Sequence, residues 1–211
     1  MSSKDTNAKC KICRRAGKKL FLRGDRCYSS KCAMNKRKFP PGQHGPQGFP
    51  RSSEYGRQLR EKQALKNFYH LREKQFKNYF EKAKQKGANT EAWFMRFLEK
   101  RLDNVVYRAQ FAKARLQSRQ LISHGHVLVN GRKMDIPSYQ VEVGDVIELK
   151  DKKEIKDLIQ NRLAEKNKNQ QIPKWIDVDQ KKLKIKIIEE PSEEDLPQEF
   201  KTRMIIAYYS R

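Results

Sequence analysis

Four cysteines lie near the start of the chain, and thiols are the side chains in this sequence best suited to hold a metal ion. They form two close pairs, Cys10 with Cys13 and Cys27 with Cys32, and 13 residues separate the pairs. Two such pairs are typical of a tetrahedral zinc site. Structural zinc contributes roughly 10–16 kcal/mol of apparent binding energy in small modules, which becomes folding energy. We therefore predict a structural zinc ion at these four cysteines.

Three alternatives use the same cysteines. A four-iron cluster also binds four thiolates, and the spacing does not exclude it. Two disulfides or four free thiols are the other choices. The N-terminal residues 1–5 lack the apolar stretch of a secretion signal, so disulfides are disfavoured. Zinc is therefore preferred, with the iron–sulfur cluster second.

The composition favours a polyanionic partner. The net charge is +23 and the pI is near 10.0, with 36% hydrophobic and 35% charged residues. A surface this basic repels itself, and nucleic acid is the first candidate to relieve it. An anionic membrane surface is the second candidate, but it requires a basic helix with a free apolar face, and no apolar run is long enough to span a bilayer. We therefore expect a nucleic-acid partner and a modest core.

Residues 1–50 form a basic arm around the cysteines. They hold 13 Lys and Arg against two acids, a net charge of +11, which is too basic and too poor in apolar residues for a hydrophobic core of its own. Residues 39–50 contain four of the eight prolines and predict an extended, turn-rich linker with no helix. There we expect close backbone approach to RNA, with His44 stacking or hydrogen bonding. A solvated linker is the alternative.

Helical periodicity follows the arm. From a Ser pair at 52–53, a predicted N-cap, apolar residues recur at steps of three and four as far as Lys86, and Gly56 permits a bend that would make two helices. Gly87 ends this segment, and Asn89 begins another helix.

Residues 101–149 predict two short helices followed by a small sheet. Apolar residues recur at helical spacing over 102–109 and 116–122, and after Gly125 the period changes to two. Gly125 can take a positive φ just past a helix. Asn130 followed by glycine is the strongest short hairpin signal in a sequence.

Arginines follow these two helices at regular intervals. Arg101, Arg108 and Arg115 are seven residues apart, and Arg119 is four further on. Few acids are interleaved, so we predict a cationic face turned toward phosphates. The alternative is a solvated helix surface.

The last part of the chain alternates helix and strand. A charged helix is expected over 152–166, and strands over 175–178 and 183–188. Residues 189–199 hold six acids and no base, so this run should face solvent or a basic protein neighbour. Residues 204–211 are apolar enough to dock against the body.

Three motifs resemble a known family. They are Pro-Pro-Gly-Gln-His-Gly at 40–45, Arg-Leu-Asp-Asn-Val-Val-Tyr-Arg at 101–108 and Ser-His-Gly-His-Val-Leu-Val-Asn-Gly at 123–131. They resemble the bacterial-type small-subunit ribosomal protein four family, and residues 101–149 resemble its alpha-L RNA-binding module. One departure is Ala114, where the family usually has a Ser or Thr N-cap. The missing cap lowers the stability of the helix by about 1 kcal/mol.

The resemblance implies an α+β fold. It implies a helical N-terminal domain with a four-cysteine metal-binding loop, and an alpha-L domain in which two helices pack on a small, mostly antiparallel sheet. The corresponding domains are 1–50, the arm and linker; 51–100, a helical domain packed with the tail 190–211; and 101–189, the alpha-L domain with its extension. Some family members carry the cysteines and others lack them.

The implied function is structural. Such proteins bind the five-prime domain of 16S-type small-subunit rRNA early in assembly, contact neighbouring small-subunit proteins, lie near the path by which messenger RNA enters, and affect decoding accuracy. This implies a place in the cytoplasmic small ribosomal subunit, no membrane, no small-molecule substrate and no enzymatic activity.

The predicted RNA-binding residues are cations, amides, histidines and one serine that follow the basic arm and the alpha-L module. They are Arg14, Arg15, Lys18, Lys19, Arg23, Arg37, Lys38, Gln43, His44, Arg51, Arg57, Arg101, Arg108, Arg115, Arg119, Ser123, His124, His126, Asn130 and Arg132.

Two other functions use the same features. An RNA-modifying enzyme could carry this module, but the sequence has no P-loop, no dinucleotide fingerprint and no nucleophile–base arrangement. His124 and His126 lack a nearby acid or nucleophile, so contact is preferred to catalysis. A zinc-knuckle nucleic-acid-binding regulator is the other choice, but no recognition helix follows the knuckles.

Overall fold

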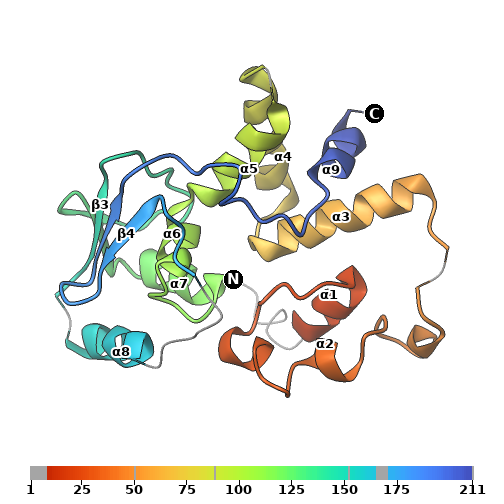
Figure 1. Cartoon of the computed structure of the whole chain (residues 1–211), viewed down its shortest axis with the longest axis horizontal. Helices are drawn as coiled ribbons and strands as arrows, with labels where there is room; N and C mark the ends of the chain where they lie inside the picture. The colour runs from red at the N-terminus through yellow and green to blue at the C-terminus, as the bar shows by residue number, and fades with distance from the viewer. Residues whose placement is uncertain (1–8, 50, 88, 152, 165–170, 211) are drawn as a thin grey trace. The chain divides into compact units, whose positions relative to one another are not determined.

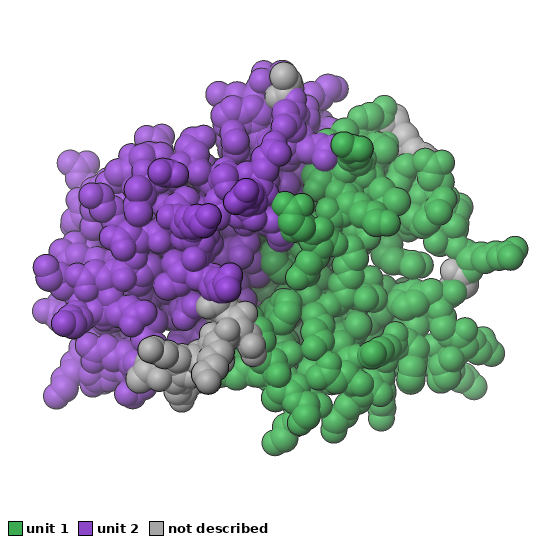
Figure 2. All heavy atoms as spheres, in the orientation of Figure 1, with its two compact units in different colours: residues 1–78, 198–211 green, residues 79–197 purple. Residues whose placement is uncertain are grey.

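The computed structural model describes residues 9–49, 51–87, 89–151, 153–164 and 171–210. The chain forms two compact units (Figure 2): unit 1 is residues 1–78 with 198–211, and unit 2 is residues 79–197. None of the helices in the described ranges combines the length and apolarity needed to cross a bilayer.

Unit 1 is helical. Its longer elements are α1 (Lys9–Ala16), α3 (Glu54–Phe68), the first part of α4 (Glu73–Gln85) and α9 (Thr202–Tyr209); the shorter ones are η2 (Gly24–Cys27), α2 (Ala33–Lys36) and η3 (Gly45–Gln47) (Figure 1). The turn η3 lies in the stretch for which the sequence predicted no helix, because a single 3₁₀ turn is compatible with proline at its start.

The helix α3 begins as the sequence predicted. Ser53 is its N-cap, and the Ser53 Oγ accepts a hydrogen bond of 3.2 Å from the Gly56 backbone N–H. The break that separates α3 from α4 lies at residues 69–72, not at Gly56. His70 adopts a positive φ of 54° there, while Tyr69 and Leu71 on either side are buried. The break therefore lies between two buried side chains, at a position that no Gly or Pro marks.

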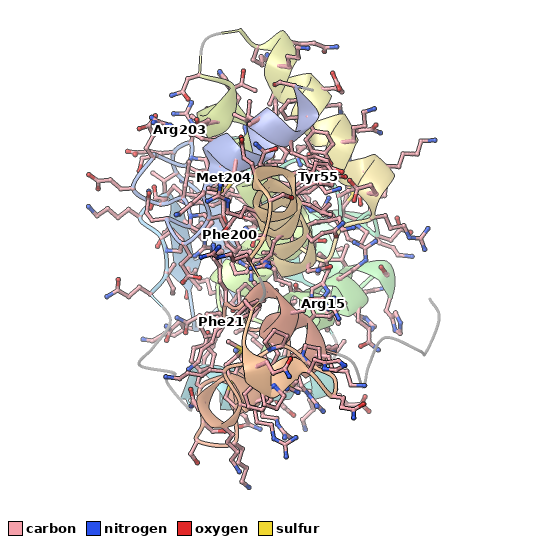
Figure 3. The ribbon with its side chains drawn as sticks, turned by 90° about the vertical axis from the view of Figure 1, so that its right-hand side faces the viewer. Arg15, Phe21, Tyr55, Phe200, Arg203 and Met204 are labelled. Atoms are coloured by element: carbon pink, nitrogen blue, oxygen red, sulfur yellow. The ribbon has the colours of Figure 1, made fainter. Side chains whose placement is uncertain are left out.

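The core of unit 1 joins α3 to the C-terminal helix. α9 packs along α3, and the ring centroids of Tyr55 on α3 and Tyr208 on α9 are 5.6 Å apart. Just before α9, the ring centroid of Phe200 lies 5.0 Å from that of Phe68. Tyr55 and Phe200 are labelled in Figure 3. Lys62 is buried in this region, pairs with Glu73 and lies 4.5 Å from the Tyr208 ring centroid. The apolar tail is thus part of the core of this unit.

Unit 2 contains helices and a five-stranded antiparallel sheet of order β2-β1-β3-β5-β4. The elements are the rest of α4, α5 (Thr90–Glu99), α6 (Leu102–Arg108), α7 (Arg115–Ser123), β1 (Val127–Val129), β2 (Arg132–Met134), β3 (Val146–Leu149), α8 (Lys153–Ala164), β4 (Ile176–Asp179) and β5 (Lys184–Ile187). Two helices followed by a small antiparallel sheet is the arrangement that the sequence predicted for residues 101–149.

One apolar core connects α6, α7 and α8 to the sheet. Its fully buried members include Val105, Ile122, Ile147, Ile159 and Ile185. The alternation predicted for the last strand holds, since Ile185 and Ile187 are buried while the lysines between and before them are exposed. The sheet therefore supports the helices from one face.

The turn between β1 and β2 is the hairpin that the sequence predicted. Asn130 and Gly131 both have positive φ angles, 50° and 76°. The Asn130 side chain donates to Asp145 at 2.8 Å and accepts from the Val146 N–H at 2.9 Å. The turn residue thereby ties β1 to β3.

Two further contacts lie at the start of α7 and at the end of α5. Ala114 provides no side-chain cap for α7, but Gln117 accepts a hydrogen bond of 2.7 Å from the Lys113 N–H. The acidic segment is attached to α5, because Glu190 pairs with Lys100 at 2.9 Å and the Pro191 carbonyl accepts from Arg96 at 3.1 Å.

The compact units do not follow the predicted domain borders at 50, 100 and 189. Packing divides the chain within α4, at residues 78 and 79, and again at residues 197 and 198. The predicted domains describe sequence motifs and remain a prediction.

Candidate nucleic-acid interface

Arg101 lies in the core of unit 2. Its side chain has no exposed surface, and its guanidinium donates to both carboxylate oxygens of Asp103, at 3.0 and 2.6 Å, and to the Tyr79 hydroxyl at 2.8 Å. Burial would lower the pKa of Arg101, but Asp103 and Tyr79 raise it above its usual value, so the group stays charged. The predicted RNA contact at Arg101 is wrong for this structure, because the guanidinium cannot reach a ligand.

Glu99 is the second buried acid of this network. It has no exposed surface, and its carboxylate accepts from Arg108 at 2.8 and 3.0 Å and from the Asn104 amide at 2.7 Å. The Arg108 side chain is 22% exposed. Arg108 therefore reaches the surface from a carboxylate that fixes its position.

Arg115 and Arg119 extend the network along α7. Arg115 is buried, donates from Nε to the Asn104 side-chain oxygen at 2.8 Å and lies 4.4 Å from the Tyr107 ring centroid. Arg119 is 29% exposed on its side chain and lies 3.5 Å from Asp103. The predicted cationic face is thus mostly internal. Buried Arg115 joins α7 to α6, and buried Arg101 joins the start of α6 to Tyr79 on α4. Of these four arginines only Arg108 and Arg119 present surface to a ligand.

The turn after α7 presents the more open groups. Ser123, His124 and Arg132 are exposed, and His126 is half-buried with its ring 6.0 Å from that of His124. Gly125 between the histidines is buried with a φ of 70°, and a side chain there would meet Lys133. Glycine thus permits the close turn that sets the two histidines beside each other.

The predicted contacts near the basic arm are of two kinds: side chains bonded within the protein and exposed side chains. Arg14 donates to the Phe39 and Pro40 carbonyls at 2.9 and 3.0 Å, and Lys18 binds Glu61 and the Glu199 carbonyl at 2.8 Å each. Lys19 is half-buried. The exposed members are Arg15, Arg23, Arg37, Lys38, Gln43, His44, Arg51 and Arg57.

The structure brings the four cysteines together. Cys10, Cys13, Cys27 and Cys32 line one small cavity, and all four thiols are free. Burial raises the pKa of the Cys13 thiol to about 11, and repulsion from the neighbouring thiols acts in the same direction. The alternative of two disulfides is therefore not the arrangement in this structure, and the thiols share one space.

The metal-binding loop itself is not confirmed. Within the described part of the chain, no group of three or more His, Cys, Asp and Glu residues is arranged to hold a metal ion. The donor chemistry fits zinc, because four thiols face one cavity between α1 and α2.

The structure gathers a group of cations on the arm that the sequence placed near the cysteines only in part and predicted as RNA contacts only in part. Lys11, Arg14, Arg26, Lys31, Lys36 and Arg37 line a hollow of about 440 Å³, which we call the basic hollow. Four of these residues, Lys11, Arg26, Lys31 and Lys36, were not among the predicted contacts. Their convergence depends on how α1 packs against α2, which no spacing in the sequence indicates.

Comparison with known proteins accounts for nearly the whole chain. Residues 4–99 match the family described as Ribosomal protein S4/S9 N-terminal domain, and residues 100–147 match the S4 domain. The chain is 46% identical to small ribosomal subunit protein uS4 of Thermus thermophilus over 202 residues, 96% of each chain. It is 49% identical to the uS4 of Caldicellulosiruptor saccharolyticus over 210 residues, 99% of this chain and 100% of the relative. The uS4 of Clostridioides difficile is 46% identical over 206 residues, 98% of each.

Proposed function

The chain belongs to the small ribosomal subunit protein uS4 family, and from this premise we propose that it is a structural, rRNA-binding component of the small ribosomal subunit and not an enzyme. The observation that carries the proposal is similarity over almost the full length to proteins with this name. The place of action is then the small subunit of the cytoplasmic ribosome.

The mechanism is electrostatic attachment to a rigid, shaped surface. Exposed residues of the arm and of α3, such as Arg15, Arg23 and Arg57, neutralise backbone phosphates and release counterions, so affinity falls steeply with salt. The turn at Ser123, His124 and His126 supplies hydrogen-bond donors and acceptors that reach riboses and phosphates across RNA of matching shape.

The buried network gives this surface its rigidity. Asp103 and Asn104 on α6 each accept a hydrogen bond from an arginine of α7, Arg119 and Arg115, so the two helices cannot slide past each other without exposing a buried charge. Glu99 holds Arg108 of α6 in place. Arg108 and Arg119 thereby reach the surface in one fixed orientation. Less side-chain freedom is lost when such groups bind.

The finer role follows the family resemblance. We propose binding in the five-prime domain of 16S-type rRNA early in assembly, contact with neighbouring small-subunit proteins, and a position near the path of incoming messenger RNA, where it affects accuracy. The acidic segment supports a protein neighbour of basic charge, because Glu193 and Glu194 remain exposed on a chain with a net charge of +23.

The cysteine cavity is proposed as a structural zinc site, with an iron–sulfur cluster as the alternative. Four free thiols lining one cavity support this proposal. A bound cation would favour the thiolate forms that burial disfavours, and it would link α1 to the loop that carries Cys27 and Cys32.

Metal removal tests the zinc proposal. Chelation or Cys10→Ser should loosen the arm while the rest of the chain stays folded, and amide hydrogen exchange resolved by peptide is the measurement. Ser30→Ala, at an exposed serine on the same loop, is the control. Protein purified from its own ribosomes with neither zinc nor iron on elemental analysis would contradict the proposal.

Ribosome association tests the function itself. The chain should co-sediment with small ribosomal subunits and bind structured small-subunit rRNA more tightly than duplex DNA at equal salt. Absence from the subunits in lysates, together with no preference for rRNA, would overturn the proposal.

A further inference from the structure

The acidic segment, residues 189–199, is bonded to the C-terminal half of α5. The Lys100 ammonium, at the C-cap of α5, donates to the Glu190 carboxylate at 2.9 Å. The Arg96 guanidinium donates from Nε to the carbonyl of Pro191, a buried residue, at 3.1 Å. Two successive residues of the segment are therefore held by cations of α5.

A third bond reaches the opposite end of the same helix. Asn89 is the N-cap of α5, and its side-chain amide donates to Glu193 at 3.0 Å. The order of contacts is antiparallel, since residues 193, 191 and 190 meet residues 89, 96 and 100 in turn. The segment thus follows α5 from its N-cap to its C-cap.

The surface of α5 has the chemistry of a single-strand nucleic-acid site. The ring centroids of Trp93 and Phe97 are 6.0 Å apart, and both side chains are half-buried. Lys86 and Arg96 lie 5.6 and 5.3 Å from the Trp93 ring centroid. Bases stack on rings of this kind while the adjacent cations meet phosphates. We call Lys86, Trp93, Arg96, Phe97 and Lys100 the α5 patch.

Glu190 interacts with each cation of the α5 patch. The hydrogen bond from Lys100 lowers the pKa of Glu190 below its ordinary value, burial opposes this effect, and the charges of Arg96 and Lys86 lower it further. One carboxylate of the chain is therefore already placed where an RNA phosphate would meet these cations. Opposite charges at short range reduce the potential that attracts a polyanion.

We propose that the acidic segment blocks nucleic acid from the α5 patch by occupying its cations, and so limits the binding of RNA of unrelated sequence; this rests on the proposed function. An RNA phosphate gains Lys100 only by displacing Glu190. A chain with a net charge of +23 attracts single strands of any sequence, and an open stacking surface would strengthen that binding.

Charge neutralisation tests this block. Glu190→Gln with Glu193→Gln keeps the size of both side chains and removes two charges that face α5. The affinity of the full chain for oligouridylate should rise, and the slope of log K on log salt should steepen by roughly 0.7 for each cation released. Glu154→Gln with Asp157→Asn, at exposed acids of α8, makes the same change in net charge and should have a smaller effect. Equal gains in the two double variants would overturn the inference.

Tryptophan fluorescence shows whether oligouridylate reaches the α5 patch. The chain has two tryptophans, and Trp175 is 1% exposed, so quenching by the oligonucleotide reports stacking on Trp93. Quenching should appear in the variant neutralised at residues 190 and 193 but not in the unaltered chain or the α8 control. Equal quenching of the unaltered chain would mean that the patch is open, and its absence from the neutralised variant would mean that RNA does not use the patch. Either result overturns the inference.

Lys100→Ala in the otherwise unaltered chain gives a further measurement. Because Glu190 already occupies Lys100, the salt slope for oligouridylate should change little, whereas in the neutralised variant the same substitution should remove most of the gain. A fall of about 0.7 in the unaltered chain, one full phosphate contact, would overturn the inference. Small-subunit rRNA is titrated against the same proteins. If the unaltered chain fails to bind it, the proposed function fails, while the oligouridylate comparison still decides whether the segment blocks the patch.

Discussion

The arginines of α6 and α7 and the lysines of the basic hollow stand in similarly basic stretches of sequence, but the fold treats them differently. The arginines converge on two buried acids, Glu99 and Asp103, and most of their hydrogen bonds are internal. Among the described residues no acid lines the hollow, and its lysines stay exposed. Two buried carboxylates are therefore enough to make neighbouring arginines part of the internal hydrogen-bond network of the fold. The charge of a segment alone therefore does not tell whether it serves the fold or a ligand.

The strongest test of this difference removes the acid at the centre of the network. Asp103→Ala should leave the Arg101 guanidinium buried without its main partner, a loss of roughly 3–5 kcal/mol in the free energy of unfolding. Urea denaturation measures it. Asp151→Ala, at an exposed ion pair with Lys156, is the control and should change little. Comparable stability of both variants would mean that the network contributes nothing to the fold.

Arg115 and Arg119 separate the two roles within one helix. Arg115→Ala should cost about 2 kcal/mol, because a buried, charged hydrogen bond to Asn104 is lost. Arg119→Ala should cost less stability than Arg115→Ala, because Arg119 is 29% exposed and lies 3.5 Å from Asp103, and it should lower the salt slope of rRNA binding by roughly 1. Unfolding curves and binding titrations on both variants give the comparison. The reverse pattern would show that the external face includes Arg115.

Acid stability tests the lysine pairs of unit 1. Burial would raise the pKa of Glu73, but hydrogen bonds from Lys62, Lys66 and Tyr209 outweigh it and hold the pKa at about 2. The Glu73 carboxylate contributes fully to the free energy of unfolding above pH 4.5, the ordinary pKa of a glutamate. This contribution is lost as the pH falls from 4.5 toward 2, because the unfolded chain takes up the proton first.

Glu73→Gln should therefore flatten the decline of the urea midpoint over this pH range. Glu81→Gln, exposed on the same helix, is the control. Since the Glu73 side chain is 46% exposed, this effect should be smaller than either of the preceding stability losses. If the urea midpoints of the two variants fall identically between pH 4.5 and 2, the ion pairs of Glu73 with Lys62 and Lys66 play no role in acid stability.

Local signals in the sequence were reliable where a single residue type decides the backbone. The Ser53 cap, the positive φ at Gly125 and the turn at Asn130 each follow from short-range chemistry. The break at His70 was missed, because no Gly or Pro marks it and it lies between two side chains that are buried only in the folded unit. The predicted RNA-binding residues show the same difference, since exposure at His124 was predictable and burial of Arg101 was not.

The sequence by itself determined the class of fold, the order of helices and strands in unit 2, the family, and a partner that carries many negative charges. Periodicity, turn residues, long motifs and net charge are properties of contiguous chain and need no knowledge of packing. Only the tertiary structure decided which cations are paired internally, where the four thiols meet, and which lysines surround the basic hollow. These depend on contacts between residues far apart in the chain, where burial and the distance to an acid set the energy of each charge.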